Sequence, residues 1–377
     1  MIDLELSDEQ QLLKQSADRF VERDYPFDKR KAAVASDDGF RREVWKTFAD
    51  LGWLGLGLPE DLGGFGGARD IAILAEALGV GLVNEPFLAS VVLSGGTIAR
   101  AGSRTQQEAI LTPLIGGETL LAFAHSERQA RFDIAAVAAT ARRQGDRYVL
   151  NGAKSVVLNG DTADRLIVSA RSAGGGRDED GLSLFLVDPA SKGVARRGYR
   201  TNDGGRAAEI ALDNVEVPAD ALLGEEGQAY PVIEETVDRA AAALCGEALG
   251  LMAKLNDLTL DYSKTREQFG QPIGKFQALQ HRMVDMFVAL EEARSLATVY
   301  MTDVDSADRN ERRRAVSAMK AQTAKSGRLV GQEAIQLHGG IGMTDDYMAS
   351  HYFKRLTVVS RLFGDVDWHL ERFASLD

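Results

Sequence analysis

Residues 266–277 read Arg-Glu-Gln-Phe-Gly-Gln-Pro-Ile-Gly-Lys-Phe-Gln, and this stretch decides the interpretation of the chain. Further along, positions 336–342 read Gln-Leu-His-Gly-Gly-Ile-Gly. An arginine can pair with a pyrophosphate through a bidentate fork, and clustered glycines let backbone N–H groups approach a phosphate or an adenine. Each segment follows a long helical stretch. Together they predict the two halves of a dinucleotide-binding site.

Composition limits the classes of protein that the chain can represent. With 377 residues, 45% of them hydrophobic, the chain is long enough for two or three globular domains. A formal charge of -12 disfavours a nucleic-acid or anionic-membrane partner, because such partners require a basic face. A single cysteine, Cys245, excludes an intramolecular disulfide and fits a reducing compartment. The acidic N-terminus does not resemble a signal peptide, and no apolar run approaches the ~20 residues needed to span a bilayer. These features predict a cytoplasmic protein with no membrane partner.

The hydrophobic pattern changes twice along the chain. Residues 1–117 carry helical signals, including the capping-box pairs Ser7 with Gln10 and Ser103 with Gln106. Residues 118–224 contain short apolar runs between turn residues, which predict strands at 120–124, 148–151, 165–170 and 182–187. From 225 to 377 the helical period returns, most plainly in an apolar stripe between Phe276 and Tyr300. We therefore predict three domains at 1–117, 118–224 and 225–377.

This order of helical, β and helical domains, together with the two segments quoted above, resembles the acyl-CoA dehydrogenase family over essentially the whole chain. The resemblance implies an α+β fold: an N-terminal helical domain, a middle β-barrel or sandwich domain and a C-terminal four-helix bundle.

The resemblance also implies FAD as the cofactor. Arg266, Phe269 and Gln277 would contact the adenosine diphosphate half of an FAD held mainly by a neighbouring subunit. Gln336 and the backbone of Gly339 and Gly340 would close over the same half. Such sharing requires an oligomer. Taken alone, Gly339 and Gly340 are also compatible with an ordinary helix C-cap and turn.

Three further segments resemble the small subunit of pimeloyl-CoA dehydrogenase, which works with a related large subunit; these are 122–131, 201–209 and 351–356. The resemblance implies an acyl-CoA substrate and transfer of electrons to an electron-transfer flavoprotein. The partner chain would be a large acyl-CoA dehydrogenase subunit or further copies of this chain in a tetramer.

The middle domain departs from the family pattern. Ser126 keeps the hydroxyl of the family's Thr-Glu-Pro-x-Ala-Gly-Ser-Asp segment and is expected to bond the flavin ring, but the Pro, Gly and Ser are replaced. The family's Trp-Ile-Thr-Asn-Gly is Val-Val-Leu-Asn-Gly at 156–160, which lacks the aromatic and the threonine that face the flavin.

The catalytic base is the larger departure. The implied reaction removes an α-proton from a thioester while a hydride leaves the β-carbon for the flavin, so it needs a carboxylate with a raised pKa. Most members supply the Glu of a Glu-Gly-Thr segment, which is Phe363 here. Some branches supply it from the first long helix of the C-terminal bundle, which gives Ala240.

Three carboxylates lie near these two positions in the sequence. Glu247 follows Ala240 by two turns on the same helix face, roughly 10 Å further along. It is either the base or a buried carboxylate paired with an arginine or a backbone N–H. Asp238 and Asp365 are the other candidates, with solvated or helix-end acids as the alternative.

Two histidines lie inside the motifs. His125 either polarises a substrate or flavin oxygen or is a hydrogen-bonded structural imidazole, and His338 lies within the glycine motif. The remaining histidines show no metal-ligand spacing, so no metal site is predicted.

Two other functions stay open. The chain either performs the chemistry or completes a partner's FAD site without catalysis, as the lost Glu positions suggest. A family relative that uses oxygen, an oxidase or flavin monooxygenase, is the third possibility.

Overall fold

The computed structural model describes residues 5–376. These residues divide into two compact units, which are described separately. One unit comprises residues 5–32, 68–83 and 241–376, and the other comprises residues 33–67 and 84–240. The terminal residues 1–4 and 377 of the predicted outer domains lie outside the described residues. The domain bounds 1–117, 118–224 and 225–377 stay a prediction.

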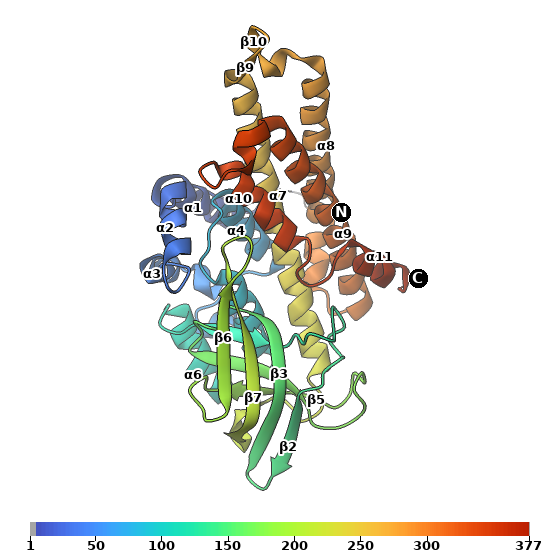
Figure 1. Cartoon of the computed structure of the whole chain (residues 1–377). Helices are drawn as coiled ribbons and strands as arrows, with labels where there is room; N and C mark the ends of the chain where they lie inside the picture. Colours follow the sequence, from blue (N-terminus) through green and yellow to red (C-terminus); the bar gives the residue numbers. More distant parts are fainter. Residues whose placement is uncertain (1–4, 377) are drawn as a thin grey trace. The chain divides into compact units, whose positions relative to one another are not determined.

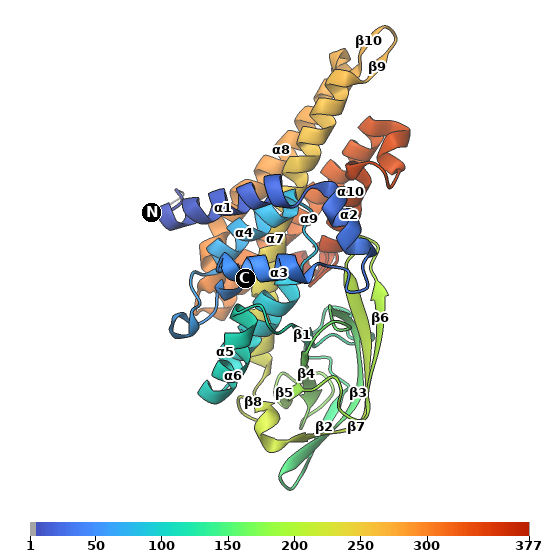
Figure 2. The same cartoon turned by 90° about the vertical axis from the view of Figure 1, so that its left-hand side faces the viewer.

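The unit formed by 33–67 and 84–240 contains a mixed β-sheet. Its strands are β1 (Leu121–Ala124), β2 (Thr140–Gln144), β3 (Arg147–Leu158), β4 (Arg165–Arg171), β5 (Leu182–Val187), β6 (Val194–Arg200), β7 (Arg206–Pro218) and β8 (Leu222–Leu223). The order is β6-β7-β3-β2-β4-β5-β8, and β1 pairs with β4 in parallel. Figure 2 shows the long strands β3, β6 and β7 side by side, and β2 links them to β4 and β5. The four predicted strand segments correspond to β1, β3, β4 and β5 and are confirmed.

The β2–β4 link joins two parts of this sheet by a single pair, Thr140 with Arg171. On one side β2, β3, β7 and β6 are antiparallel, and on the other side β5 is antiparallel to β4. The inner faces are closely packed, since Leu150, Val168 and Phe185 are fully buried. The same unit holds several helical segments: α3 (Arg42–Asp50), η1 (Trp53–Gly55), η2 (Glu60–Leu62), η3 (Phe87–Gly95), α5 (Gly96–Ala101), α6 (Arg104–Ile115) and η4 (Ala219–Ala221).

The other unit is helical. It contains α1 (Asp8–Asp24), α4 (Ala68–Val80), α8 (Gln277–Tyr300), η6 (Met301–Asp305), α9 (Arg309–His338), η7 (Gly339–Met343), α10 (Met348–Val359) and α11 (Val366–Ala374). The unit boundaries fall within α2 (Phe27–Ala35) and α7 (Tyr230–Thr265). In Figure 1, α7 and α8 run beside each other to a hairpin made of β9 (Glu267–Gln268) and β10 (Gln271–Pro272), followed by η5 (Ile273–Lys275).

Both predicted capping boxes are present. The Ser7 hydroxyl accepts from the Gln10 backbone at the start of α1, and the Ser103 hydroxyl accepts from the Gln106 backbone at the start of α6. In each case the glutamine side chain bonds back to the serine N–H. The two helix starts could be predicted because a capping box depends only on residues three positions apart.

Glycines set the approach of α4 to α7. A Cβ on Gly250 would lie 1.9 Å from the carbonyl oxygen of Glu76, and one on Gly246 would lie 2.6 Å from that of Ala72. Gly79 of α4 faces the Glu247 carbonyl in the same way. The small residues around Glu247 therefore serve backbone contact between two helices.

The apolar stripe predicted between Phe276 and Tyr300 forms α8 and is divided in this chain. Met286, Leu290 and Ala293 are buried, as expected of a bundle core, but Phe287 is 58% exposed. Val284 beside it is 56% exposed. One face of α8 therefore presents apolar side chains that this chain does not cover.

Candidate functional site

Arg266 marks the point where α7 ends and the β9–β10 hairpin begins. Its N–H donates to the carbonyl of Tyr262 at 2.8 Å, and its own carbonyl accepts from the N–H of Ile273 at 2.8 Å. The hairpin tip contains Phe269, with φ +54°, and Gly270, with φ +78°. These backbone bonds fix the place of Arg266 while its side chain is exposed to solvent.

The second half of the predicted site lies where α9 ends. Gln336 is exposed, and Gly339 follows the last helical residue with φ +63° and ψ -139°, a conformation that favours glycine. Added Cβ atoms on Gly339 or Gly340 would meet nothing within 4 Å. The end of α9 thus presents backbone and a polar side chain to the outside of this unit.

Tyr262 and His338 connect the two halves. Their rings stack with centroids 4.7 Å apart and planes inclined by 28°. Because Tyr262 accepts the N–H of Arg266 and His338 lies two residues beyond Gln336, this contact brings the ends of α7 and α9 side by side. Two segments far apart in the sequence therefore lie side by side, and their contact with one shared cofactor stays a prediction.

The exposed residues around these two helix ends suit a charged ligand held against a second surface. Phe269 is 92% exposed and its ring meets Phe276 edge-on at 6.1 Å, while Met343 of η7 is 74% exposed. Gln277 begins α8 and is also exposed. Exposed apolar side chains beside an arginine and open glycine backbone are typical of an interaction site.

In the β-sheet unit, the loop after β1 carries the predicted flavin contact Ser126. The Ser126 carbonyl accepts from the N–H of Ser155 on β3 at 2.9 Å, which fixes this loop against the strand. Ser126 itself is half-buried. The structure therefore gives its hydroxyl a defined place on the unit, and its contact with a flavin stays a prediction.

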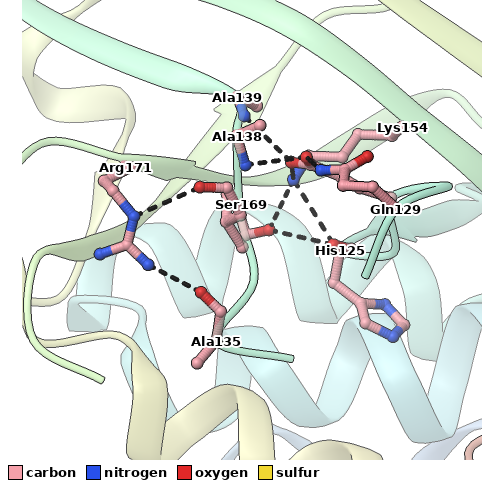
Figure 3. A network of polar contacts seen from close by, with 10 residues as sticks. His125, Gln129, Ala135, Ala138, Ala139, Lys154, Ser169 and Arg171 are labelled. Atoms are coloured by element: carbon pink, nitrogen blue, oxygen red, sulfur yellow. Dashed lines mark hydrogen bonds and ion pairs between the residues drawn. The ribbon is translucent and has the colours of Figure 1, made fainter. Parts of the chain in front are cut away.

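A buried ion pair lies under this loop. Lys154 and Glu127 are 2.7 Å apart, and their side chains are 0% and 3% exposed. The Glu127 carboxylate also accepts from the N–H groups of Ala138 and Ala139 at 2.8 and 3.1 Å, and Lys154 donates to the Ser169 hydroxyl at 3.0 Å. Figure 3 shows these groups converging between β3, β4 and the loop after β1. The pair thus holds the predicted flavin segment on the sheet.

Arg171 supports the same loop from the end of β4. Its guanidinium donates to the carbonyls of Ala135 and Val137 on one side, at 2.7 and 3.3 Å, and to those of Asp178 and Asp180 on the other, at 3.1 and 3.0 Å (Figure 3 draws the first two). Burial lowers the pKa of Arg171, with nearby acids opposing this change. Because every acceptor is a backbone carbonyl, Arg171 orders two loops.

The departure at 156–160 is visible as a bulge in β3. The β3–β7 register shifts between Lys154 and Val157, and Val156 in the bulge has φ +52° and is 46% exposed. A positive φ is strained for a β-branched residue, and such strain is found at functional sites. The position where the family has a flavin-packing aromatic therefore presents a small apolar side chain in a special backbone conformation.

His125 lies beside this loop, with its ring 4.8 Å from that of Phe123. Burial and, to a smaller extent, the nearby Lys154 ammonium together lower the pKa of His125 to about 4. The imidazole is therefore neutral at ordinary pH. It can form hydrogen bonds but does not act as an acid near pH 7. Both roles predicted for His125 therefore stay open: polarising a substrate or flavin oxygen, or serving as a hydrogen-bonded structural imidazole.

Glu247 lies in a paired arrangement in the helical unit. Arg355 of α10 donates Nε to Oε1 at 2.6 Å and Nη2 to Oε2 at 2.7 Å. The two side chains are 15% and 22% exposed, respectively. Since both carboxylate oxygens are engaged by one guanidinium, this geometry matches the alternative in which Glu247 is a structural partner of an arginine.

The other candidate bases also have structural positions. Asp365 is the N-cap of α11, because its carboxylate accepts from the N–H of Trp368 at 3.1 Å, so the helix-end interpretation is correct. Asp238 is 3% exposed on α7, so the alternative of a solvated acid is wrong for it. Ala240 is fully buried, and Phe363 has φ +58°.

Among residues 5–376, no group of three potential metal ligands lies together. Within the same range no helix has the length and apolarity that a bilayer crossing demands.

Four of the five histidines have lowered pKa values in the folded chain, so we expect the protein to lose stability in mild acid. Burial lowers the pKa of His125 to about 4 and that of His369 to about 2, and it also lowers the pKa values of His338 and His351. Below pH 6.5 the unfolded chain therefore binds more protons than the folded chain, and stability falls as pH decreases. From pH 6.5 to 5 we expect a loss of roughly 2–4 kcal/mol, about 1.4 kcal/mol per pH unit for each of the two most shifted histidines.

Denaturant unfolding at pH 7, 6 and 5 measures this loss. The double replacement of His125 and His369 by Asn should flatten the profile, whereas His281→Asn, on an exposed side chain, should leave its slope unchanged. A wild-type profile that is flat between pH 7 and 5 would contradict the shifted pKa values.

Comparison with known proteins supplies an independent result. The N-terminal, middle and C-terminal domain models of acyl-CoA dehydrogenases match residues 7–118, 122–215 and 227–375. The human mitochondrial short-chain specific acyl-CoA dehydrogenase is 30% identical over 361 residues, which cover 93% of this chain and 85% of the relative.

Solved structures agree over nearly the whole chain. The FAD complex of PigA superposes with a TM-score of 0.91 at 26% identity, covering 99% of this chain and 98% of PigA. The ChsE4–ChsE5 complex from Mycobacterium tuberculosis gives 0.89 at 26%, covering 99% and 98%. A structure described as the electron transferring flavoprotein of Acidaminococcus fermentans gives 0.89 at 28%, again covering 99% and 98%.

Proposed function

Because the chain belongs to the acyl-CoA dehydrogenase family of FAD-binding oxidoreductases acting on CH–CH bonds, we propose that it is one subunit type of a hetero-oligomeric acyl-CoA dehydrogenase. In this proposal the assembly introduces a double bond next to the carbonyl of a CoA thioester and passes the electrons to an electron-transfer flavoprotein. The cytoplasm is the proposed compartment, on the grounds of composition given above.

The observation that carries the proposal is the convergence of two helix ends at the Tyr262–His338 stack. Arg266 would pair with the FAD pyrophosphate, and Phe269 and Gln277 would contact the adenosine diphosphate half beside it. Gln336 and the backbone of Gly339 and Gly340 would cover the same half. The open space above both glycines fits such a ligand.

A second chain is supported by the apolar surface of the same helical unit. Phe269, Met343 and Phe287 are 92%, 74% and 58% exposed. Large apolar side chains that the chain leaves uncovered are typical of subunit interfaces. We propose that a neighbouring subunit covers them and holds the rest of the FAD.

The identity of that neighbour rests on resemblance. Segments 122–131, 201–209 and 351–356 are similar to the small subunit of pimeloyl-CoA dehydrogenase, which favours a related large subunit over a homotetramer. The ChsE4–ChsE5 likeness supports an assembly of two different chains. A medium or bulky acyl-CoA, with a distal carboxylate as in pimeloyl-CoA, is the proposed substrate class.

When bound, FAD accepts the hydride that leaves the β-carbon of the substrate. The assembly must then supply groups that orient the substrate and a base for the α-proton. His125 is neutral and half-buried in the β-sheet unit, so it is suited to donate or accept one hydrogen bond. Ser126 is held beside it by the Ser155 N–H.

A second candidate function is a non-catalytic subunit that completes the partner's FAD site. It is favoured by the carboxylates: Glu247 is bound by Arg355, Asp365 caps α11, and the two usual Glu positions are Phe363 and Ala240. In this case the base comes from the partner chain.

Replacing Glu247 by Gln distinguishes a role of Glu247 as the catalytic base from a role as the structural partner of Arg355. Because the carboxylate is engaged by Arg355, we expect turnover of the assembled enzyme to change by less than about 3-fold, while removal of a general base would cost about 10²–10⁴-fold. A matched control is Glu333→Gln, which breaks another interhelical pair of this unit, Arg282–Glu333. A loss of several orders of magnitude in Glu247→Gln alone would identify Glu247 as the base.

The experiment that tests the proposed function is purification of the chain alone and with its candidate large subunit, followed by measurement of bound FAD and of its reduction by acyl-CoA. We expect stoichiometric FAD and reduction only in the two-chain assembly. A yellow single-chain protein that reduces its own FAD with acyl-CoA would refute dependence on a second subunit type. Hydrogen peroxide release without an electron-transfer flavoprotein would instead support the oxygen-using alternative.

A further inference from the structure

We infer that His338 is a positioning residue, an inference that rests on the proposed FAD site. Together with Tyr262 and Tyr347 it forms an aromatic clasp, which sets the distance between Arg266 and the glycine turn at Gly339 and Gly340. The clasp is defined as these three side chains, and all of them belong to the helical unit.

His338 is fixed on several sides. Its Nδ1–H donates to the Ala334 carbonyl at 2.8 Å, one turn back in α9, and Nε2 lies 3.1 Å from the Tyr347 hydroxyl. Its ring stacks on Tyr262 at 4.7 Å and meets that of Tyr347 at 5.0 Å. With 3% exposure and both nitrogens engaged, the ring has one well-defined orientation.

The three rings belong to three different segments. Tyr262 is one turn before Arg266 on α7, His338 ends α9, and Tyr347 immediately precedes α10. Tyr262 also approaches Tyr347, with centroids 6.3 Å apart. The clasp is therefore the contact through which the position of Arg266 is defined relative to Gln336 and the following glycines.

The glycine turn packs on the Cβ of the same residue. A Cβ on Gly342 would lie 2.9 Å from the Cβ of His338, so η7 folds back directly over this residue. Gly339 and Gly340 lie between these two fixed points, with backbone open to the outside. Loss of the imidazole would keep this Cβ contact but release the spacing of the glycine turn from α7, because the ring contacts with Tyr262 and Tyr347 would be lost. His338 itself is buried and acts on the cofactor only through this spacing.

This placement predicts a selective effect on the adenosine half of the cofactor. FMN contains the flavin ring and one phosphate but lacks the adenylate part. If the clasp acts through the adenosine half, His338→Ala should weaken FAD binding by at least about 10-fold and change FMN binding by less than about 3-fold, since one lost ring contact and two hydrogen bonds amount to such a factor. A general destabilisation of the fold would weaken both ligands alike.

Graded variants separate the parts of the clasp. Tyr347→Phe removes one hydroxyl and keeps the ring, so FAD affinity should fall by less than in His338→Ala. His338→Phe keeps the stack with Tyr262 and should recover part of the affinity lost in His338→Ala. Tyr300→Phe, at the far end of α8, is the control and should have no effect.

The decisive experiment is a double-mutant cycle on the deflavinated two-chain assembly, with FAD and FMN affinities measured by flavin fluorescence for wild type, His338→Ala, Arg266→Ala and the double variant. Because His338 acts on the placement of Arg266, its replacement should weaken FAD binding much less when Arg266 is already absent. Fully additive effects, or parallel losses of FAD and FMN, would overturn the positioning role. If the wild-type assembly binds no FAD at all, it is the proposed function that fails.

Discussion

Replacing Arg266 by Ala is expected to weaken the affinity of the assembled protein for FAD by about 10- to 100-fold, since a charge-assisted hydrogen-bonded contact contributes about 1.5–3 kcal/mol. The fold should persist. Arg266 is exposed and lies at the helix end, and its structural bonds to Tyr262 and Ile273 are made by the backbone. The measurement is a fluorescence titration of the deflavinated assembly with FAD.

Two matched variants sharpen this result. Arg266→Lys keeps the charge but loses the planar fork, so its FAD affinity should lie between those of wild type and Arg266→Ala. Lys264→Ala removes an exposed cation from the same end of α7, where Lys264 pairs only across one turn with Asp261, and should leave FAD affinity unchanged. Equal losses in Arg266→Ala and Lys264→Ala would mean that general positive charge, and no specific contact, is responsible.

Replacing Lys154 by Met is expected to destabilise the β-sheet unit by about 3–5 kcal/mol, because it leaves the Glu127 carboxylate buried without its cation. Burial lowers the pKa of Lys154 to about 8, and the neighbouring Glu127 opposes this shift. The ammonium is therefore largely charged at pH 7, and its removal breaks a charged pair. The measurement is the denaturant midpoint of unfolding, monitored by a spectroscopic signal that reports on the β-sheet unit.

The double variant Lys154→Met with Glu127→Gln removes both charges and keeps an acceptor for the N–H groups of Ala138 and Ala139. It should recover a large part of the loss. The control is Arg147→Met in the exposed Arg147–Glu216 pair, whose side chains are 52% and 60% exposed. That change should leave the denaturant midpoint nearly unchanged, because both side chains are solvated. A similar small effect in Lys154→Met would show that the buried pair does not support the sheet.

Local sequence signals predicted much of the fold. The capping boxes at Ser7 and Ser103 depend on neighbours three residues away, and the strands at β4 and β5 depend on short runs with turn residues at both ends. The ends of α7 and α9 were recognised from two motifs. Their contact through Tyr262 and His338 was not predicted, since stacking between rings far apart in the chain leaves no periodic pattern.

The polar core of the β-sheet unit was missed for a similar reason. Lys154 lies on a strand where a charged residue would normally face solvent, and its partner Glu127 belongs to a loop after a different strand. Lys154 stands between Ala153, which is exposed, and the polar Ser155, so no apolar flank in the sequence indicates its burial. Glu247 and Arg355 are 108 residues apart, so the sequence alone could not show whether Glu247 is a catalytic base or one half of an ion pair. The structure shows the ion pair.

The account depends on one arrangement: Arg266 and the Gln336–Gly340 segment hold the same half of one FAD at a contact between subunits. The most direct measurement is an experimental structure of the FAD-loaded two-chain assembly. It should show the Arg266 guanidinium within hydrogen-bonding distance of the pyrophosphate, with Gln336 and the Gly339–Gly340 backbone against the same adenosine diphosphate and the flavin ring on the neighbouring chain. An FAD whose adenosine diphosphate touches neither segment would contradict the account.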